Sequence, residues 1–72
     1  MGKFKEIDIE LQERNITLPY TLNYQEYTAT LYPNMEVEFL YNDDIDGYVF
    51  AKSIENFERI TINWMKTGEL LV

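Results

Sequence analysis

Cysteine and histidine are both absent from this chain of 72 residues. Without cysteine the chain can form no disulfide and offer no thiolate ligand, and without histidine the usual zinc sites of proteins cannot be built. The same absences exclude Cys–His pairs and Ser–His–Asp triads, which leaves only aspartate, glutamate, lysine and tyrosine for proton transfer. The composition therefore predicts a non-enzymatic protein that binds no cofactor.

Basic residues are scarce and unevenly placed. Lysine and arginine number 6 against 13 aspartates and glutamates, so the formal net charge is −7. No basic residue lies between Asn15 and Ala51, whereas several acidic residues do: Glu26, Glu36, Glu38, Asp43, Asp44 and Asp46. Because a phosphate backbone attracts cations, no direct nucleic-acid binding is expected. Such an acidic stretch suits a basic protein partner, although a net charge of this size also serves plain solubility.

Long apolar runs are missing too. The longest fully apolar run is Tyr48–Ala51, far short of the roughly 20 residues of a transmembrane helix. Residues 1–6 contain no apolar stretch of the kind found in a secretory signal. We therefore expect a protein of the cytoplasm with no membrane contact.

The length of the chain predicts a single domain, residues 1–72. A domain of about 60 residues hides only about 60% of the surface that its unfolded chain exposes, so small domains often gain stability by self-association. A homodimer is accordingly the expected assembly. We expect the apolar residues 70–72 to dock on the domain or to contact a second subunit.

Alternating apolar and polar residues predict strands from the start of the chain. Residues 6–12 alternate and favour a strand, although the spacing of their apolar residues with Phe4 also suits one side of a helix. Residues 16–18 have an extended pattern and lead to Pro19. Proline cannot donate to a ladder, so this segment is expected at an edge or an end of the sheet.

The clearest predicted strands lie in the middle of the chain. Residues 24–32 are rich in tyrosine, threonine and leucine, which suit a pleated surface. Residues 35–41 alternate, and residues 42–47 have the composition of a turn in which Gly47 supplies a positive φ. Residues 48–51 then return as a strand, so the last three segments predict a hairpin.

The last third of the chain changes to a helical period. One face of a helix over residues 54–66 would hold an apolar stripe, formed by Ile54, Phe57, Ile60, Thr61 and Trp64. Ser53 suits the N-cap and Gly68 the position after the helix, although residues 60–64 also alternate as a strand would. The predicted fold class is α+β: a small antiparallel, meander-like sheet with one C-terminal helix packed on one face. The stripe would cover the inward row of the hairpin, Val37, Phe39 and Tyr41.

The sharpest motif lies in the predicted turn. Asn42, Asp44, Asp46 and Gly47 have the spacing of the first ligands and the glycine of an EF-hand calcium loop. Ser53 stands where that loop needs a bidentate glutamate, so any calcium affinity would be millimolar at best. Aspartate, asparagine and glycine are also the ordinary residues of turns, which is the simpler interpretation.

Tyrosines accompany the acidic residues in the middle of the chain. Tyrosine supplies a large contact area and is common at interfaces, although core packing and strand propensity also account for tyrosine-rich strands. Together the two residue types predict a partner-binding surface. Its candidate residues are Glu36, Glu38, Asp43, Asp44, Asp46, Tyr41 and Tyr48.

A resemblance adds to this interpretation. Residues 27–39, with the sequence Tyr-Thr-Ala-Thr-Leu-Tyr-Pro-Asn-Met-Glu-Val-Glu-Phe, and residues 53–66 resemble small accessory proteins of SPbeta-type Bacillus prophages. No activity is assigned to that group, so the resemblance implies host-directed binding rather than metabolism.

Three functional hypotheses follow. The first is a phage-derived, non-enzymatic protein-binding module whose acidic, tyrosine-rich surface engages a basic host protein. The second is a small structural or self-assembling protein. The third is a weakly calcium-responsive module that uses Asn42, Asp44 and Asp46.

Overall fold

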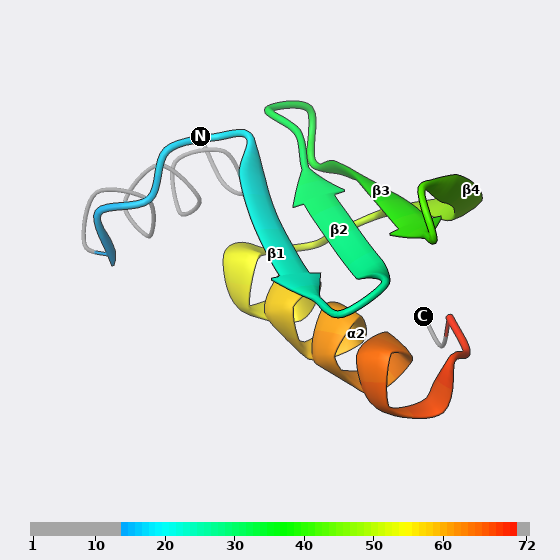
Figure 1. Ribbon diagram of the computed structural model, residues 1–72. Coiled ribbons are helices and arrows are strands. Elements are labelled where there is room, and N and C mark those ends of the chain that lie inside the picture. Colours follow the sequence, from blue (N-terminus) through cyan, green and yellow to red (C-terminus); the bar gives the residue numbers. More distant parts are fainter. Residues whose placement is uncertain (1–13, 71–72) are drawn as a thin grey trace.

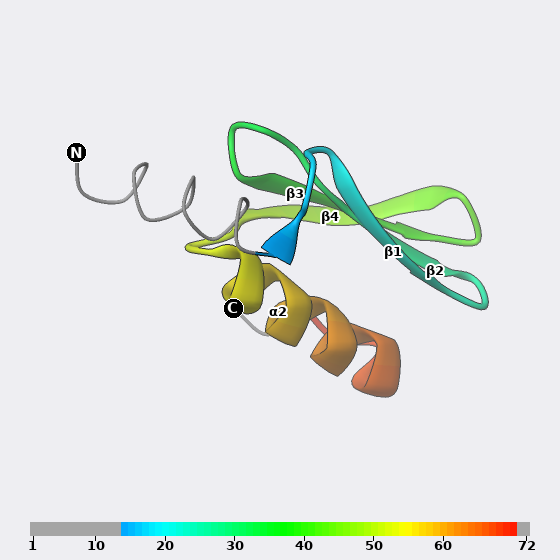
Figure 2. The same ribbon diagram turned by 90° about the vertical axis from the view of Figure 1, so that its left-hand side faces the viewer.

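A computed structural model describes residues 14–70 of the chain, which form one sheet and one helix in two layers (Figure 1). The four strands are antiparallel and lie side by side in chain order. Seen from the side, α2 lies against one face of the sheet (Figure 2). This arrangement confirms the predicted α+β meander. The elements are β1 (Tyr20–Tyr24), β2 (Tyr27–Leu31), β3 (Glu36–Tyr41), β4 (Asp44–Phe50) and α2 (Ile54–Thr67).

The core lies between the sheet and α2. Ala29, Leu31, Val37 and Phe39 alternate along β2 and β3 and are fully buried. Val37 and Phe39 confirm the predicted inward row of the hairpin, but Tyr41 at the end of that row remains 41% exposed. The predicted strand over residues 6–12 lies outside the described residues.

Residues 24–32 were predicted to form one strand, but they belong to two strands, β1 and β2. The chain reverses at Gln25, which adopts a φ of 53°, and Tyr24 pairs with Tyr27 across the turn. Gln25 carries none of the usual turn chemistry, so nothing in the local sequence marked this reversal. Residues 16–18 are not a strand. Instead β1, one of the two edge strands of the sheet, begins directly after Pro19.

The β3–β4 turn is shorter than predicted. It consists of Asn42 and Asp43, which have φ values of 52° and 67°. Positive φ at both central residues is the geometry of two-residue turns that match the twist of a hairpin, and asparagine and aspartate tolerate it well. Asp44 therefore pairs with Tyr41, and the chain from Asp44 onward belongs to β4 rather than to a loop.

Gly47 was predicted to form part of a turn, but it lies in β4, where its lack of a side chain matters for packing. A Cβ atom at Gly47 would lie 2.7 Å from Cδ1 of Leu70. The missing side chain therefore lets the segment after α2 pack beside β4, and Leu70 contacts the core there. This agrees with the expected docking of the apolar segment as far as Leu70, the last described residue.

The helix follows its predicted boundaries. The Ser53 side chain accepts a hydrogen bond from the backbone N–H of Asn56 at 3.0 Å, and Gly68 takes a left-handed φ of 76° after the last turn. Ile62, which the helical spacing placed off the stripe, is 50% exposed. The whole predicted stripe is buried: Ile54, Phe57, Ile60, Thr61 and Trp64.

Trp64 joins the helix to the sheet. Its ring meets the rings of Tyr27 and Phe39 edge to face, each with a centroid separation of 4.9 Å. Its indole N–H donates to Oδ2 of Asp46 at 3.0 Å, so the polar atom of this buried side chain is satisfied. Aromatic contacts and one hydrogen bond therefore fix α2 against β2, β3 and β4.

Thr61 is a polar residue in the core that lowers the stability of the domain. Its side chain is fully buried, and its hydroxyl has no hydrogen-bond partner among the described residues. An unpaired buried hydroxyl costs free energy that valine, of nearly the same shape, does not. We expect Thr61→Val to raise the free energy of unfolding by about 1 kcal/mol in urea denaturation. Thr61→Ser keeps the hydroxyl and should destabilise the domain; a destabilised valine variant would contradict this account.

Candidate functional site

The face of the sheet turned away from α2 divides into two halves. Over β1 and β2 it is neutral and polar, and hydroxyls of Thr21 and Thr30 lie 3.1 Å apart there. Over β3 and β4 it carries acidic, aromatic and aliphatic side chains. We call this second half the outer sheet face. It consists of Tyr32, Glu36, Glu38, Leu40, Ile45, Tyr48 and Phe50.

Large apolar side chains on the outer sheet face are exposed. Phe50 is 67% exposed, Ile45 59% and Tyr48 50%, and all three lie on the edge strand β4. Across the ladder, Glu36 pairs with Phe50 and Glu38 with Tyr48. Each of these two glutamates thus has an aromatic neighbour directly opposite.

Glu38 is at the centre of a hollow in the outer sheet face. The hydroxyl of Tyr32 donates to its Oε1 at 3.3 Å, and that of Tyr48 donates to its Oε2 at 3.4 Å. Both contacts are longer than an ordinary hydrogen bond between oxygens. The hollow has a volume of about 560 Å³. Its lining residues are Tyr32, Pro33, Asn34, Glu36, Glu38 and Tyr48.

The local sequence holds this hollow in shape. Tyr32 stands in the β2–β3 turn, where its N–H donates to the carbonyl of Glu36 at 2.8 Å and its carbonyl accepts from Met35 at 2.8 Å. Asn34 accepts from the N–H of Glu36 at 3.0 Å through its side-chain oxygen, an Asx turn. Tyr48 is fixed opposite Glu38 by the β3–β4 ladder.

The two tyrosines remain protonated hydrogen-bond donors at neutral pH. Partial desolvation and then the negative charge of Glu38 raise the pKa of Tyr32 and the pKa of Tyr48 above their usual value. The hollow therefore presents phenol donors, aromatic surfaces and carboxylate acceptors. These groups suit recognition of a cation.

The structure separates the seven residues predicted as a partner surface. Three of them, Glu36, Glu38 and Tyr48, lie together on the outer sheet face. The other four lie elsewhere: Asp43 and Asp44 at the hairpin tip, and Tyr41 and Asp46 toward the face that α2 covers.

Tyr41 and Asp46 have internal contacts instead. The ring of Tyr41 lies 5.0 Å from that of Tyr27, and the Asp46 carboxylate accepts the indole N–H of Trp64. Ile45 and Phe50, which share the outer sheet face with Glu36 and Glu38, were not among the predicted residues. The alternation of β4 would have placed these two residues on the outer sheet face only if the length of the preceding turn had been known.

The arrangement around Asn42 differs from a calcium loop. Asp44 and Asp46 belong to β4 and not to a loop, and the Asp46 carboxylate accepts from Trp64. Within residues 14–70, no three or more Asp, Glu, His or Cys side chains gather to hold a metal ion. The geometry therefore does not support the calcium hypothesis for Asn42, Asp44 and Asp46.

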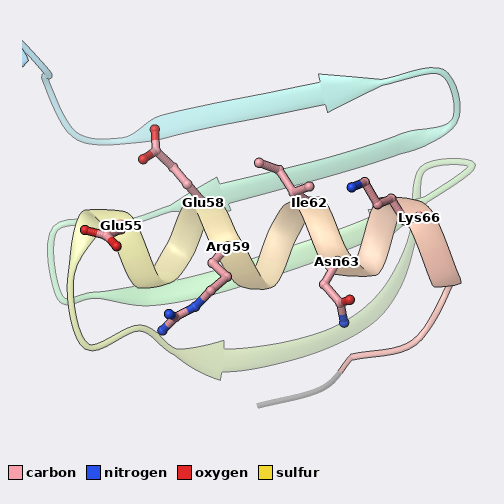
Figure 3. A pocket seen from close by; sticks show the side chains of 6 residues that line it. All are labelled: Glu55, Glu58, Arg59, Ile62, Asn63 and Lys66. Carbon is pink, nitrogen blue, oxygen red and sulfur yellow. The ribbon is translucent and has the colours of Figure 1, made fainter.

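A second hollow lies on the solvent side of α2 (Figure 3). There Glu58 and Ile62 extend on the side of β1, and Arg59 and Asn63 on the opposite side. Its lining carries both carboxylates and cations. The hollow measures about 440 Å³ and is lined by Glu55, Glu58, Arg59, Ile62, Asn63 and Lys66.

Glu58 ties the start of the described chain to the helix. Both of its oxygens accept from the Arg14 guanidinium at 2.7 Å, and the Tyr20 hydroxyl donates to Oε2 at 2.7 Å. These donors, Arg14 above all, hold the pKa of Glu58 below its ordinary value of 4.5. Burial and then Glu58 raise the pKa of Tyr20. The cluster joins β1 to α2 and is a structural feature.

The Glu58 cluster makes stability depend on pH. A carboxylate with a depressed pKa stabilises the folded state above its unfolded pKa, and that contribution is lost as the pH falls through the folded value. We expect Glu58→Gln to lower the free energy of unfolding by about 1 kcal/mol at pH 7, because the group is partly exposed. The deficit should shrink as the pH drops below 4.5. Glu55→Gln, measured in the same urea titrations, is the control; an equal loss there would contradict a specific role for Glu58.

Comparisons with protein-family models, curated proteins and solved structures give no significant match to this chain. Among residues 14–70, no helix combines the length and the apolar content that a membrane crossing requires.

Proposed function

We propose that this chain is a non-enzymatic protein-binding module whose outer sheet face engages a basic partner. The observation that supports it most is the coincidence of exposed apolar side chains and carboxylates on one face. Phe50, Ile45 and Tyr48 give an apolar contact area of the kind that interfaces bury. Contiguous apolar area rimmed by polar groups is typical of interaction sites.

Charge determines which partner fits. Strands β1–β4 carry no lysine or arginine, and the one ion pair between described residues joins Arg14 to Glu58. Glu36 and Glu38 therefore form no ion pair within residues 14–70, and a second acidic surface would be repelled. A basic protein surface would be electrostatically complementary to these carboxylates and would associate with them faster. The resemblance to prophage proteins extends the proposal to a host protein in the cytoplasm.

Salt dependence tests the proposal. The probe is a short peptide of alternating lysine and serine, titrated into the full chain by calorimetry. Raising the ionic strength from about 0.1 M to about 1 M shortens the Debye length from about 10 Å to about 3 Å. We expect the affinity to fall at least about tenfold over this range. An affinity indifferent to salt, or no binding at low salt, would contradict the proposal.

A second candidate function is self-association through β4. Ile45 and Phe50 are exposed on an edge strand, and such edges invite pairing with another chain. A homodimer through this edge would cover them while leaving Glu36 and Glu38 toward solvent. Light scattering across a concentration series tests it: a monomer at every concentration contradicts self-association, and a dimer supports it.

A further inference from the structure

We propose that the hollow around Glu38 binds one arginine side chain of the basic partner. The proposal rests on the proposed function and names the group that the outer sheet face recognises. The hollow combines a carboxylate, two tyrosine rings and a volume of about 560 Å³. Its elements are joined by the β2–β3 turn and the β3–β4 ladder, so it exists before a ligand arrives.

The carboxylate has unused acceptor capacity. Glu38 receives one hydroxyl on each oxygen, and both contacts exceed 3.0 Å. An ionised carboxylate offers about four lone-pair sites, so at least half of its capacity is left for a stronger donor. No cation of the described chain pairs with it. The hydroxyls of Tyr32 and Tyr48 thus orient the group without satisfying it.

The walls of the hollow favour a cation over a neutral donor. Tyr32 and Tyr48 flank the carboxylate and are 36% and 50% exposed, so ring surface remains available. A cation placed against a tyrosine face is attracted by the ring quadrupole. Glu36 lines the same hollow and adds a second negative charge. Partial desolvation, and then the negative charge of Glu38, raise the pKa of both tyrosines, which therefore stay neutral beside a cation.

Arginine fits this arrangement better than lysine. Its planar guanidinium presents two parallel donors that match the two oxygens of one carboxylate, and the same plane stacks on an aromatic ring. A lysine ammonium is a strongly hydrated point charge that makes neither contact as well. The hollow therefore distinguishes arginine from lysine at equal charge, which a general acidic surface does not.

The experiment compares two peptides of equal length and charge. One alternates arginine with serine and the other lysine with serine. Each is titrated into the full chain and into three single variants, Glu38→Gln, Glu36→Gln and Glu55→Gln, which all lose one charge and keep the side-chain shape. Glu55 lies on α2 and is the matched control. Far-UV circular dichroism and the urea midpoint confirm that each variant is folded.

The expected result is a preference of the parent chain for the arginine peptide. We expect Glu38→Gln to weaken that peptide about tenfold, since a charge-assisted contact of this kind is lost, and to abolish the preference over lysine. Glu36→Gln should weaken both peptides by a similar, smaller factor, and Glu55→Gln should change neither. Equal affinities of the parent for both peptides, or equal effects of the Glu38 and Glu36 variants, would overturn the arginine site while leaving the proposed function intact. Failure of both peptides to bind would overturn both.

Discussion

Replacement of Trp64 with alanine is expected to remove most of the stability of the domain. The indole is only 1% exposed, contacts the rings of Tyr27 and Phe39, and donates to Asp46. Truncation of a buried tryptophan to alanine costs about 3–5 kcal/mol, and domains of this size have total stabilities near the low end of about 5–15 kcal/mol. The variant should therefore show a strongly reduced or absent urea transition in far-UV circular dichroism.

Ile62→Ala is the matched control for Trp64→Ala. It truncates another large apolar side chain of α2, but one that is 50% exposed on the opposite side. Exposed substitutions usually change stability by less than about 0.5 kcal/mol. If Trp64→Ala retained a cooperative transition within about 1 kcal/mol of the parent, the packing of α2 described above would be wrong.

Reversal of two charges on the outer sheet face is expected to abolish recognition of a basic partner. The double variant Glu36→Lys/Glu38→Lys replaces two carboxylates that form no ion pair within residues 14–70 with two cations. A basic ligand would then meet like charges, which costs several kcal/mol. We expect its affinity for the arginine–serine peptide to fall about 100-fold or more, corresponding to about 2.8 kcal/mol.

The control for this charge reversal is Glu55→Lys/Glu69→Lys. It changes the net charge by the same amount, but its residues lie on α2 and beyond it, and both are exposed. If net charge alone drove binding, the two double variants would lose the same affinity. A loss confined to the Glu36/Glu38 variant locates the interaction on the outer sheet face, whereas equal losses would contradict that location.

The helix could be predicted because the information for it is local. The capping side chain of Ser53, the apolar stripe and Gly68 all lie within one short segment, and each performs the expected role. The alternation of β2 and β3 likewise matched the buried row that α2 covers. Local propensity and tertiary packing agree in these elements.

The β1–β2 and β3–β4 turns were not fully predictable, because they use left-handed backbone at residues other than glycine. Gln25 adopts positive φ without a turn signature, and the pair Asn42–Asp43 reverses the chain before Gly47 is reached. The shortened turn, with an irregularity opposite Phe39 and Leu40, then decides which side chains of β4 share a face. Such pairing depends on residues far apart along the chain.

The same dependence explains what was missed in the candidate site. The acidic character of the region is visible in the composition, but the register alone places Tyr48 beside Glu38. The register also turns Asp46 toward Trp64 and leaves Phe50 exposed. The sequence therefore showed that the region is acidic, but it did not show which of its side chains share one face of the sheet.

An amide chemical-shift map tests the central claim most directly. The ¹⁵N-labelled full chain would be titrated with the arginine–serine peptide at low salt. The account predicts that the largest shift changes fall on Glu36, Glu38, Tyr48 and Phe50, with α2 little affected. Largest changes along the solvent side of α2, around Arg59 to Lys66, would contradict it.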